Sequence, residues 1–360
     1  MARAWHRDTY WPFVISFAGL LGLGLLFVFS ASHYDPAHYE MRQIFWVAVA
    51  LFFFAAGFLL GYRTFLGFSR LFYAAIILML LYVLAVSKAR LGAQRWIEIG
   101  PLALQPSEFA KLAVLLFLTD YLGGRPIFEK EHSTLLGAVM LTGIPMLLIL
   151  KQPDLGTALV LVSMAIAMLF YWGLKYRYFI FSILGFCLTA PLIWAGLKDY
   201  QRNRIMVFLN PERDPLGAGY TAVQSKIAIG SGGLLGKGFL HGTQTQLKFV
   251  PEHHTDFIFC VFGEEMGFAG AAVLLLCYGV LFYSILRILE HTTDVKARLL
   301  AVGLLAMLFS QVFINIGMSF GLMPITGITL PLFSYGGSSL VSTALGLGMV
   351  LSIHKERSIF

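Results

Sequence analysis

Long runs without a charged side chain alternate with short polar segments along most of this chain. A helix needs about 20 mainly apolar residues to cross a bilayer. Runs of this kind predict membrane spans at residues 9–34, 43–62, 71–87, 133–150, 155–174, 178–197 and 266–286. The run 299–354 is long enough for two further spans joined by a polar hairpin around residues 326–337.

One more span is predicted at residues 106–122, although this segment contains Glu108 and Lys111. Without it, the polar segments on either side would have to share one face of the membrane. The sequence therefore predicts an all-α, polytopic integral membrane protein with ten transmembrane helices, organised as a single domain over residues 1–360.

Composition supports this class. The 360 residues are 58% hydrophobic and only 12% charged, whereas soluble domains carry roughly 25% charged residues. This composition excludes a soluble enzyme, and also a disordered chain, which needs low hydrophobicity and many charges. The net charge of +7 is not gathered in one basic block, so nucleic-acid binding is not predicted.

The distribution of Lys and Arg predicts the orientation. The short segments on the side of the N-terminus hold about twice as many of these residues as those on the other side, and cytoplasmic loops carry such an excess. Both termini are therefore expected in the cytoplasm. Residues 198–256, between the seventh and eighth spans, then form one large extracytoplasmic loop. Apolar spacing within 221–230 predicts a short interfacial helix there, and the rest of the loop has turn chemistry.

Several charged residues near the membrane are candidates for chemistry. Asp256 stands where the large loop returns to the membrane, and it could act as a general base or cap the following helix. Glu108 and Lys111 are three residues apart, on one face of a helix. They form either a structural ion pair or part of a polar cavity, which Asp154 at the outer end of span six could join. Prolines and glycines within 324–339 interrupt the last apolar run, as backbone that lines a cavity does.

Two local patterns are weaker signals. Residues 231–238 are glycine-rich but lack the first glycine and the Ser/Thr of a phosphate-binding loop. They form either a tight interfacial turn or a row of amides beside an anion. His253, His254 and Asp256 are too close in sequence to chelate a metal well, so no protein-bound metal site is predicted.

Several longer motifs resemble one protein family. The segments are 105–111 (QPSEFAK), 151–157 (KQPDLGT), 214–220 (DPLGAGY), 224–233 (QSKIAIGSGG), 251–259 (PEHHTDFIF) and 331–338 (PLFSYGGS). In this order, from about residue 90 to the C-terminus, they resemble the SEDS family (shape, elongation, division and sporulation). Residues 238–247 are more similar to its rod-shape branch than to its division branch.

The resemblance implies ten transmembrane helices and a peptidoglycan glycosyltransferase in the cytoplasmic membrane. Such proteins polymerise lipid II at the outer membrane face, paired with a class B penicillin-binding protein that cross-links the glycan. The family's essential aspartate falls on Asp256. Its glutamate and lysine of the fourth helix fall on Glu108 and Lys111, and the aspartate of its Lys-Gln-Pro-Asp motif falls on Asp154.

Within this activity, chemistry suggests roles for individual residues. The neutral acceptor hydroxyl needs a base, which we assign to Asp256, whereas the diphosphate leaving group needs cations. The candidate cations are Arg202, Arg204, Lys226 and Lys237, with Arg204 preferred. Glu252, His254 and Ser334 complete the expected substrate-binding set.

The cofactor and the activity itself have alternatives. A divalent cation (Mg²⁺ or Mn²⁺) bridging the diphosphate would be the only cofactor. A rival interpretation is a lipid II flippase, because polar residues within spans also mark transport pathways. A third is a scaffold without catalytic activity.

Overall fold

Each predicted span is a helix in the computed structural model, which describes residues 10–33, 39–86, 95–99, 102–126, 131–196, 199–215 and 217–357. The helices are α2 (Tyr10–Ser32), α3 (Tyr39–Leu60), α5 (Ser69–Val86), α6 (Pro106–Gly123), α7 (Glu131–Lys151), α8 (Leu155–Trp172), α9 (Tyr176–Gly196), α13 (Ile258–His291), α14 (Val295–Ser319) and α15 (Gly337–Arg357). A short helix, α4 (Tyr62–Gly67), connects α3 to α5. The first and last residues of the chain lie outside the described residues.

Within the described residues, eight of these helices are long and apolar enough to cross a membrane. They are all of the long helices except α6 and α9. The chain is therefore a multi-pass membrane protein of almost entirely helical structure. Helix α6 carries Glu108, Lys111 and Asp120, so its apolar character is weaker than that of its neighbours.

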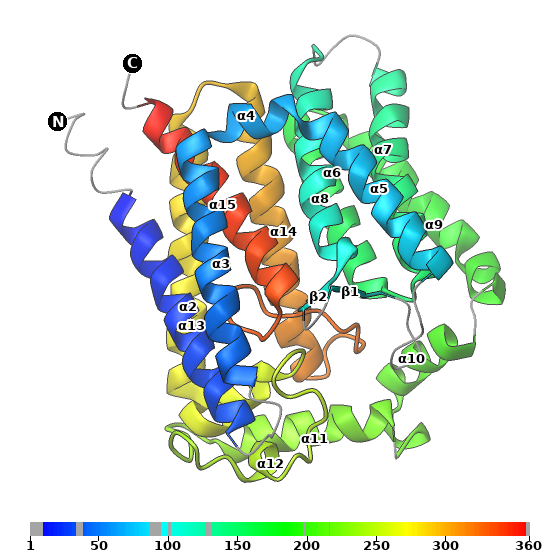
Figure 1. The fold of residues 1–360 in the computed structure, drawn as a ribbon. Coiled ribbons are helices and arrows are strands. Elements are labelled where there is room, and N and C mark those ends of the chain that lie inside the picture. The colour runs from blue at the N-terminus through cyan, green and yellow to red at the C-terminus, as the bar shows by residue number, and fades with distance from the viewer. Residues whose placement is uncertain are drawn as a thin grey trace.

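The helices form a bundle in which the chain's last helix is central. In Figure 1, α2, α3, α13, α14 and α15 occupy one half, and α5 to α9 occupy the other. The start of α2 and the end of α15 lie at the same end of the bundle. At the opposite end lie α10 (Asp199–Leu209), the 3₁₀ turn η1 (Pro211–Arg213), α11 (Ala218–Ser231) and α12 (Thr243–Gln246).

The large loop is more helical than predicted. Helix α11 confirms the helix expected at 221–230. Helix α10 was not predicted, because its sequence is polar and shows no apolar periodicity; Val207 is the only buried one among its described side chains. The all-α prediction also missed a small antiparallel hairpin of β1 (Ile97–Ile99) and β2 (Leu102–Leu104), which is too short to show a clear alternation.

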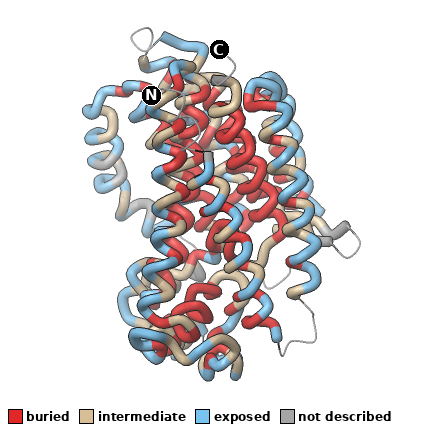
Figure 2. The backbone as a smooth tube through the Cα atoms, turned by 90° about the vertical axis from the view of Figure 1, so that its left-hand side faces the viewer, coloured by how far each residue is buried: buried red, intermediate tan, exposed pale blue. Residues whose placement is uncertain are grey.

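Helix α15 is the most buried of the eight spans, and Figure 2 shows the buried residues concentrated along the centre of the bundle. It packs directly on α3 through glycines. A Cβ on Gly348 would lie 2.2 Å from the carbonyl oxygen of Phe54, and one on Gly57 would lie 2.8 Å from that of Leu345. Small residues of this kind let two membrane helices approach backbone to backbone.

Helix α13 is interrupted at Gly267, where φ is 62° and ψ is −161°. The glycine-rich segment 232–238 fills this break. The amides of Lys237 and Gly238 donate to the carbonyls of Glu264 and Glu265 at 3.0 and 2.9 Å. In return, the amides of Phe268 and Ala269 donate to the carbonyls of Gly233 and Leu234 at 2.9 and 3.0 Å.

This pairing favours the interfacial-turn interpretation of the glycine-rich segment. The amides of Lys237 and Gly238 are engaged by main-chain carbonyls of α13, so they do not form a row of donors for an anion. Glycine is required at the junction because a Cβ on Gly236 would lie 2.1 Å from the carbonyl oxygen of Glu265.

The contact between α3 and α15 can be tested with matched alanine substitutions. Gly348→Ala places a methyl group against the backbone of α3, and overpacking of this kind costs about 1–3 kcal/mol. Gly22→Ala in α2 meets no atom within 4 Å and gains up to about 1 kcal/mol of helix propensity. Thermal unfolding in detergent should show a lower Tm for Gly348→Ala than for Gly22→Ala. Equal or reversed melting temperatures would contradict the close packing.

Candidate active site

Asp256 lies in the turn that leads into α13, at the end of the bundle that carries α10 to α12. Its main-chain carbonyl accepts a hydrogen bond of 2.8 Å from Nδ2 of Asn315 on α14. The same Nδ2 donates to the carbonyl of Ile328 at 2.6 Å. Asn315 is fully buried, so it fixes the turn before α13 against the segment between α14 and α15. A Cβ on Gly327 would lie 3.3 Å from Oδ2 of Asp256, which places that segment beside the carboxylate.

The segment between α14 and α15 is non-helical but firmly held. The hydroxyl of the buried Tyr278 donates to the carbonyl of Pro331 at 2.6 Å. Oγ of Ser334 accepts from the amide of Leu330 at 2.8 Å, and the hydroxyls of Thr329 and Ser339 are 3.0 Å apart. These contacts satisfy backbone that has no helical partner, as it must where no water replaces the lost bonds.

Asp154 reaches the same region from α8. It caps the N-terminus of that helix, accepting from the amide of Thr157 at 3.1 Å and from the Thr157 hydroxyl at 2.9 Å. The hydroxyl of Ser107 on α6 lies 3.2 Å from Oδ2 of Asp154. Asp154 is only 1% exposed. It therefore joins the ends of α6 and α8, and its charge is satisfied by donors of the protein.

Arg95 is a member of this site that the sequence analysis did not single out. Its Nε donates to the carbonyl of Gln152 at 2.8 Å, and another nitrogen of its guanidinium donates to the carbonyl of Pro153. These bonds anchor the guanidinium immediately before Asp154, within electrostatic reach of Asp256. Arg95 lies next to the β1–β2 hairpin and far from Asp256 in sequence, so no sequence pattern linked it to this site.

The pKa of Asp256 is raised to about 7. Burial is the main cause, and the negative charges of Glu252 and Asp154 add to it, whereas Arg95 and a hydrogen bond from Thr255 oppose the rise. A base is most effective when its pKa lies near the working pH. The arrangement can therefore take up a proton from a weakly acidic group at neutral pH.

Glu108 and Lys111 form the ion pair that their spacing predicts. Nζ of Lys111 lies 2.8 Å from Oε2 of Glu108, and both side chains are buried in α6. Glu108 follows Ser107, which contacts Asp154. The ion pair therefore lies close to the N-terminus of α8, which Asp154 caps. The structure leaves both its structural and its cavity-lining interpretation open.

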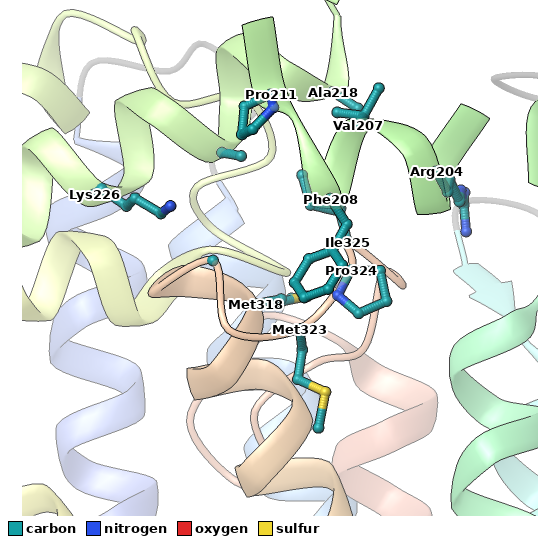
Figure 3. Close-up of a pocket in the computed structure, with 12 residues that line it drawn as sticks. Arg204, Val207, Phe208, Pro211, Ala218, Lys226, Met318, Met323, Pro324 and Ile325 are labelled. Carbon is teal, nitrogen blue, oxygen red and sulfur yellow. The ribbon is translucent and has the colours of Figure 1, made fainter. Parts of the chain in front are cut away.

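Two of the predicted cations line a pocket between α10, α11 and the end of α14, shown in Figure 3. The pocket has an empty volume of about 390 Å³ that includes its opening to solvent. Arg204 and Lys226 stand on two sides of it. The remaining lining is mainly apolar: Val207, Phe208, Pro211, Ala218, Ala222, Met318, Gly321, Met323, Pro324 and Ile325. Ile325 is two residues from Gly327, where an added Cβ would lie 3.3 Å from Oδ2 of Asp256. The segment between α14 and α15 therefore lines the pocket and also lies beside the carboxylate.

The other predicted cations have protein partners. Nζ of Lys237 lies 2.7 Å from Oε1 of Glu264 and 2.7 Å from the hydroxyl of Thr243. Arg202 donates to the carbonyls of Trp194 and Ala195 at 3.1 and 2.6 Å, at the end of α9. Neither lines the pocket.

Of the three remaining candidates, Glu252 and His254 lie within the turn before α13, and Ser334 lies in the segment between α14 and α15. The carbonyl of Glu252 accepts from the amides of Thr255 and Phe257, and its side chain is exposed. The ring of His254 stacks on Tyr39 with a centroid separation of 4.3 Å. Ser334 is buried and braces its own hairpin.

Glu264 is a buried carboxylate that the sequence analysis missed. Besides Lys237, it accepts from the amides of Gln244 and Thr245 at 2.8 and 3.0 Å and from the Thr245 hydroxyl at 2.9 Å. It thus holds α12 and the preceding loop against α13. An acidic pair directly before the eighth apolar run, Glu264 and Glu265, was the available signal.

Within the part of the chain that the structure describes, no group of three or more His, Cys, Asp or Glu side chains could hold a metal ion. The oxygens of Asp154 and Glu264 are already engaged by donors. These residues therefore do not fit a resident metal site.

The fold and the site define a class, a multi-pass helical membrane protein with its polar chemistry gathered at one end of the bundle. The sequence profile of one family, described as Cell cycle protein and covering FtsW, RodA and SpoVE proteins, matches residues 12–359. The chain belongs to this family, which confirms the resemblance seen in the sequence motifs.

Relatives match over almost the whole chain. The peptidoglycan glycosyltransferase MrdB of Escherichia coli is 40% identical, with 98% of this chain and 97% of MrdB covered. The peptidoglycan glycosyltransferase RodA of Treponema pallidum is 32% identical, with 97% of this chain and 98% of that protein covered.

Solved structures agree with the fold. The rod-shape-determining protein RodA of Thermus thermophilus superposes with a TM-score of 0.72 at 34% identity, covering 96% of this chain and 97% of its own. A chain of a peptidoglycan synthase complex, described for its coordination of polymerization and crosslinking, gives a TM-score of 0.83 at 36% identity. It covers 96% of this chain and 98% of its own.

The raised pKa of Asp256 predicts how its carboxyl group titrates. The infrared band of its protonated form, identified by its loss in Asp256→Asn, should disappear with a midpoint near pH 7. Glu252→Gln removes a negative charge and should lower the midpoint, whereas Arg95→Gln removes a positive charge and should raise it. Arg95→Lys keeps the charge and serves as the control.

The same shift predicts a pH-dependent stability. Because the folded-state pKa lies above the ordinary value of 3.8, Asp256 stabilises the fold fully only at low pH and loses this contribution as the pH rises through 7. Asp256→Asn should therefore gain in Tm relative to the wild type between pH 5 and 8. A midpoint near pH 4 in the infrared titration would contradict the raised pKa. So would a difference in Tm between Asp256→Asn and the wild type that stays constant with pH.

Proposed function

We propose that this chain is a peptidoglycan glycosyltransferase that polymerises lipid II into glycan strands at the outer face of the cytoplasmic membrane. The relatives from Escherichia coli and Treponema pallidum carry this activity in their names. The observation that supports the chemistry best is the titratable Asp256, beside a pocket with cationic sides and an apolar lining. The likeness to rod-shape proteins supports a role in cell elongation.

The proposed orientation follows from the positive-inside rule. Ten helices cross the membrane, with α6 and α9 added to the eight, and both termini are cytoplasmic. Residues 198–256 then lie outside the cell, together with Asp256 and the pocket. The start of α2 and the end of α15 lie at one end of the bundle, and α10, α11 and α12 lie at the other, which supports this arrangement.

In the proposed reaction, the carboxylate of Asp256 accepts the proton of the acceptor sugar's 4-hydroxyl group. The oxygen of that hydroxyl forms the new glycosidic bond at the anomeric carbon of the donor, whose bond to the diphosphate breaks. Undecaprenyl diphosphate leaves with the electron pair. A diphosphate is a good leaving group without protonation, so one carboxylate is sufficient, unlike the pair that a glycosidase uses.

The leaving diphosphate would be stabilised by Arg204 and Lys226. Both line the pocket, and the apolar residues between them suit the first isoprene units of the lipid. Lys237 and Arg202 are weaker candidates for binding the diphosphate. Lys237 is paired with Glu264, and Arg202 donates to a carbonyl at the end of α9. A divalent cation would neutralise further charge on the diphosphate when bound.

The proposed partner is a class B penicillin-binding protein, which would cross-link the glycan as it emerges. The structural similarity to a chain of a peptidoglycan synthase complex supports this partnership. Membrane lipids and lipid II are the remaining partners, with Glu108, Lys111 and Asp154 extending the polar region beside Asp256.

Polymerisation by the purified protein tests the role of Asp256. In liposomes that contain labelled lipid II and the partner, Asp256→Ala should lower the initial rate about 10²–10⁴-fold, the usual effect of losing a general base. The length of the glycan chains is read on gels. A flippase would change only the leaflet in which lipid II is accessible, and a scaffold would leave Asp256→Asn as active as the wild type.

The diphosphate assignment predicts a difference between neighbouring cations. Arg204→Gln and Lys226→Gln should each slow polymerisation by about 10²-fold, because each removes a charge that stabilises the leaving group. Arg202→Gln lies on the same helix as Arg204 but outside the pocket, and it should have a much smaller effect. Similar losses in all three variants would show that general loop damage, and not the pocket, is responsible.

A further inference from the structure

Among the described residues of the outer loop, the two most exposed large apolar side chains are leucines. Leu234 is 74% exposed and Leu235 is 83% exposed. They lie in the segment 232–238, which fills the break in α13. Adjacent apolar side chains that face outward form an apolar surface that is available to a partner.

The depth of these leucines can be measured along α13. The amides of Phe268 and Ala269 donate to the carbonyls of Gly233 and Leu234, so the leucines lie level with the break. From Gly267 to Arg287 the chain rises for about 20 residues, or about 30 Å at 1.5 Å per residue. This is the thickness of the hydrocarbon core of a bilayer.

Helix α2 gives the same depth independently. The hydroxyl of Ser30 donates to Oε1 of Glu265 at 2.6 Å, and Phe27 packs against Phe262 with ring centroids 4.6 Å apart. Ser30 therefore lies level with the break in α13. It is also about 30 Å along α2 from Trp11, at the beginning of that span. Two helices thus place the leucines at the boundary of the hydrocarbon core.

The surface around the leucines continues into the lipid-facing side of α13. Phe268 directly follows the break and is 69% exposed, and Leu276, two turns deeper, is 66% exposed. The leucine pair extends this apolar surface to the edge of the membrane. The segment 233–238, which contains the leucine pair, makes four backbone hydrogen bonds to α13, so the helix fixes the depth of the pair.

We propose that Leu234 and Leu235 form a hook that inserts into the boundary of the lipid bilayer, in the outer leaflet for the orientation proposed above. The partner is lipid, whose acyl chains and interfacial groups accept leucine side chains at this depth. Helix α11, which carries Lys226, ends three residues before the hook. The hook therefore holds one side of the pocket at a constant height above the lipid.

Spin labels in the protein alone, reconstituted in vesicles of phosphatidylethanolamine and phosphatidylglycerol, test this proposal. Leu235→Cys is labelled after replacement of Cys187, Cys260 and Cys277, the three free cysteines. Leu276→Cys serves as the lipid-embedded control. Glu212→Cys, in the exposed turn between α10 and α11, serves as the aqueous control.

The readout compares collisions with oxygen, which partitions into lipid, and with a water-soluble nickel chelate. The label at residue 235 should favour oxygen several-fold more than the label at residue 212, with a depth between residues 212 and 276. Nickel accessibility equal to that at residue 212 would overturn the proposal. So would protection that arises only after a class B penicillin-binding protein is added, because the surface would then be a protein interface. Polymerisation is not measured, so the outcome is independent of the proposed enzyme activity.

Discussion

The structure depends on how it satisfies backbone that is not helical at the edge of the membrane and inside it. Within the hydrocarbon core no water replaces a lost hydrogen bond, so an unpaired amide or carbonyl costs several kcal/mol. The break in α13 is filled by main-chain groups of residues 232–238. The segment between α14 and α15 is held by side chains from several helices, among them Asn315 and Tyr278. These interruptions create a polar region at one end of an otherwise apolar bundle, and Asp256 lies beside the segment between α14 and α15.

The carboxylates of this region differ in how many hydrogen bonds their oxygens accept. Asp154 accepts hydrogen bonds from a helix N-terminus and from hydroxyl groups. Glu264 accepts from two amides, two hydroxyls and an ammonium group. At Asp256, burial and two neighbouring negative charges outweigh Arg95 and the single hydroxyl of Thr255. The first two carboxylates therefore hold neighbouring segments in place, whereas Asp256 can exchange a proton near neutral pH.

The large loop combines these elements into one unit. Helix α11 lines the pocket with Lys226 and then continues into the turn that fills the break in α13. Glu264, just before that break, fastens α12 to the same helix. Main-chain hydrogen bonds and the side chain of Glu264 thus connect the wall of the pocket to α13.

Much of the protein could be predicted from the sequence because the bilayer permits few solutions. Runs of about 20 apolar residues gave the positions of the long helices, and the spacing of Glu108 and Lys111 gave their ion pair. The motifs gave the family, and the position of Asp256 at the end of the loop marked it as a candidate base. Each of these signals is local, since it lies within one helix or one short segment.

Only the tertiary structure decided which residues share the site. Arg95 and Asn315 act on Asp256 from distant segments, so no sequence pattern connects them. Arg204 and Lys226 line one pocket, while Lys237 and Arg202 have other partners, although all four are basic residues of the same loop. The break in α13 was hidden within an apolar run. Its glycine-rich partner, residues 232–238, lies 29 to 35 residues before Gly267, and its role depends on hydrogen bonds that form only when the two segments fold together.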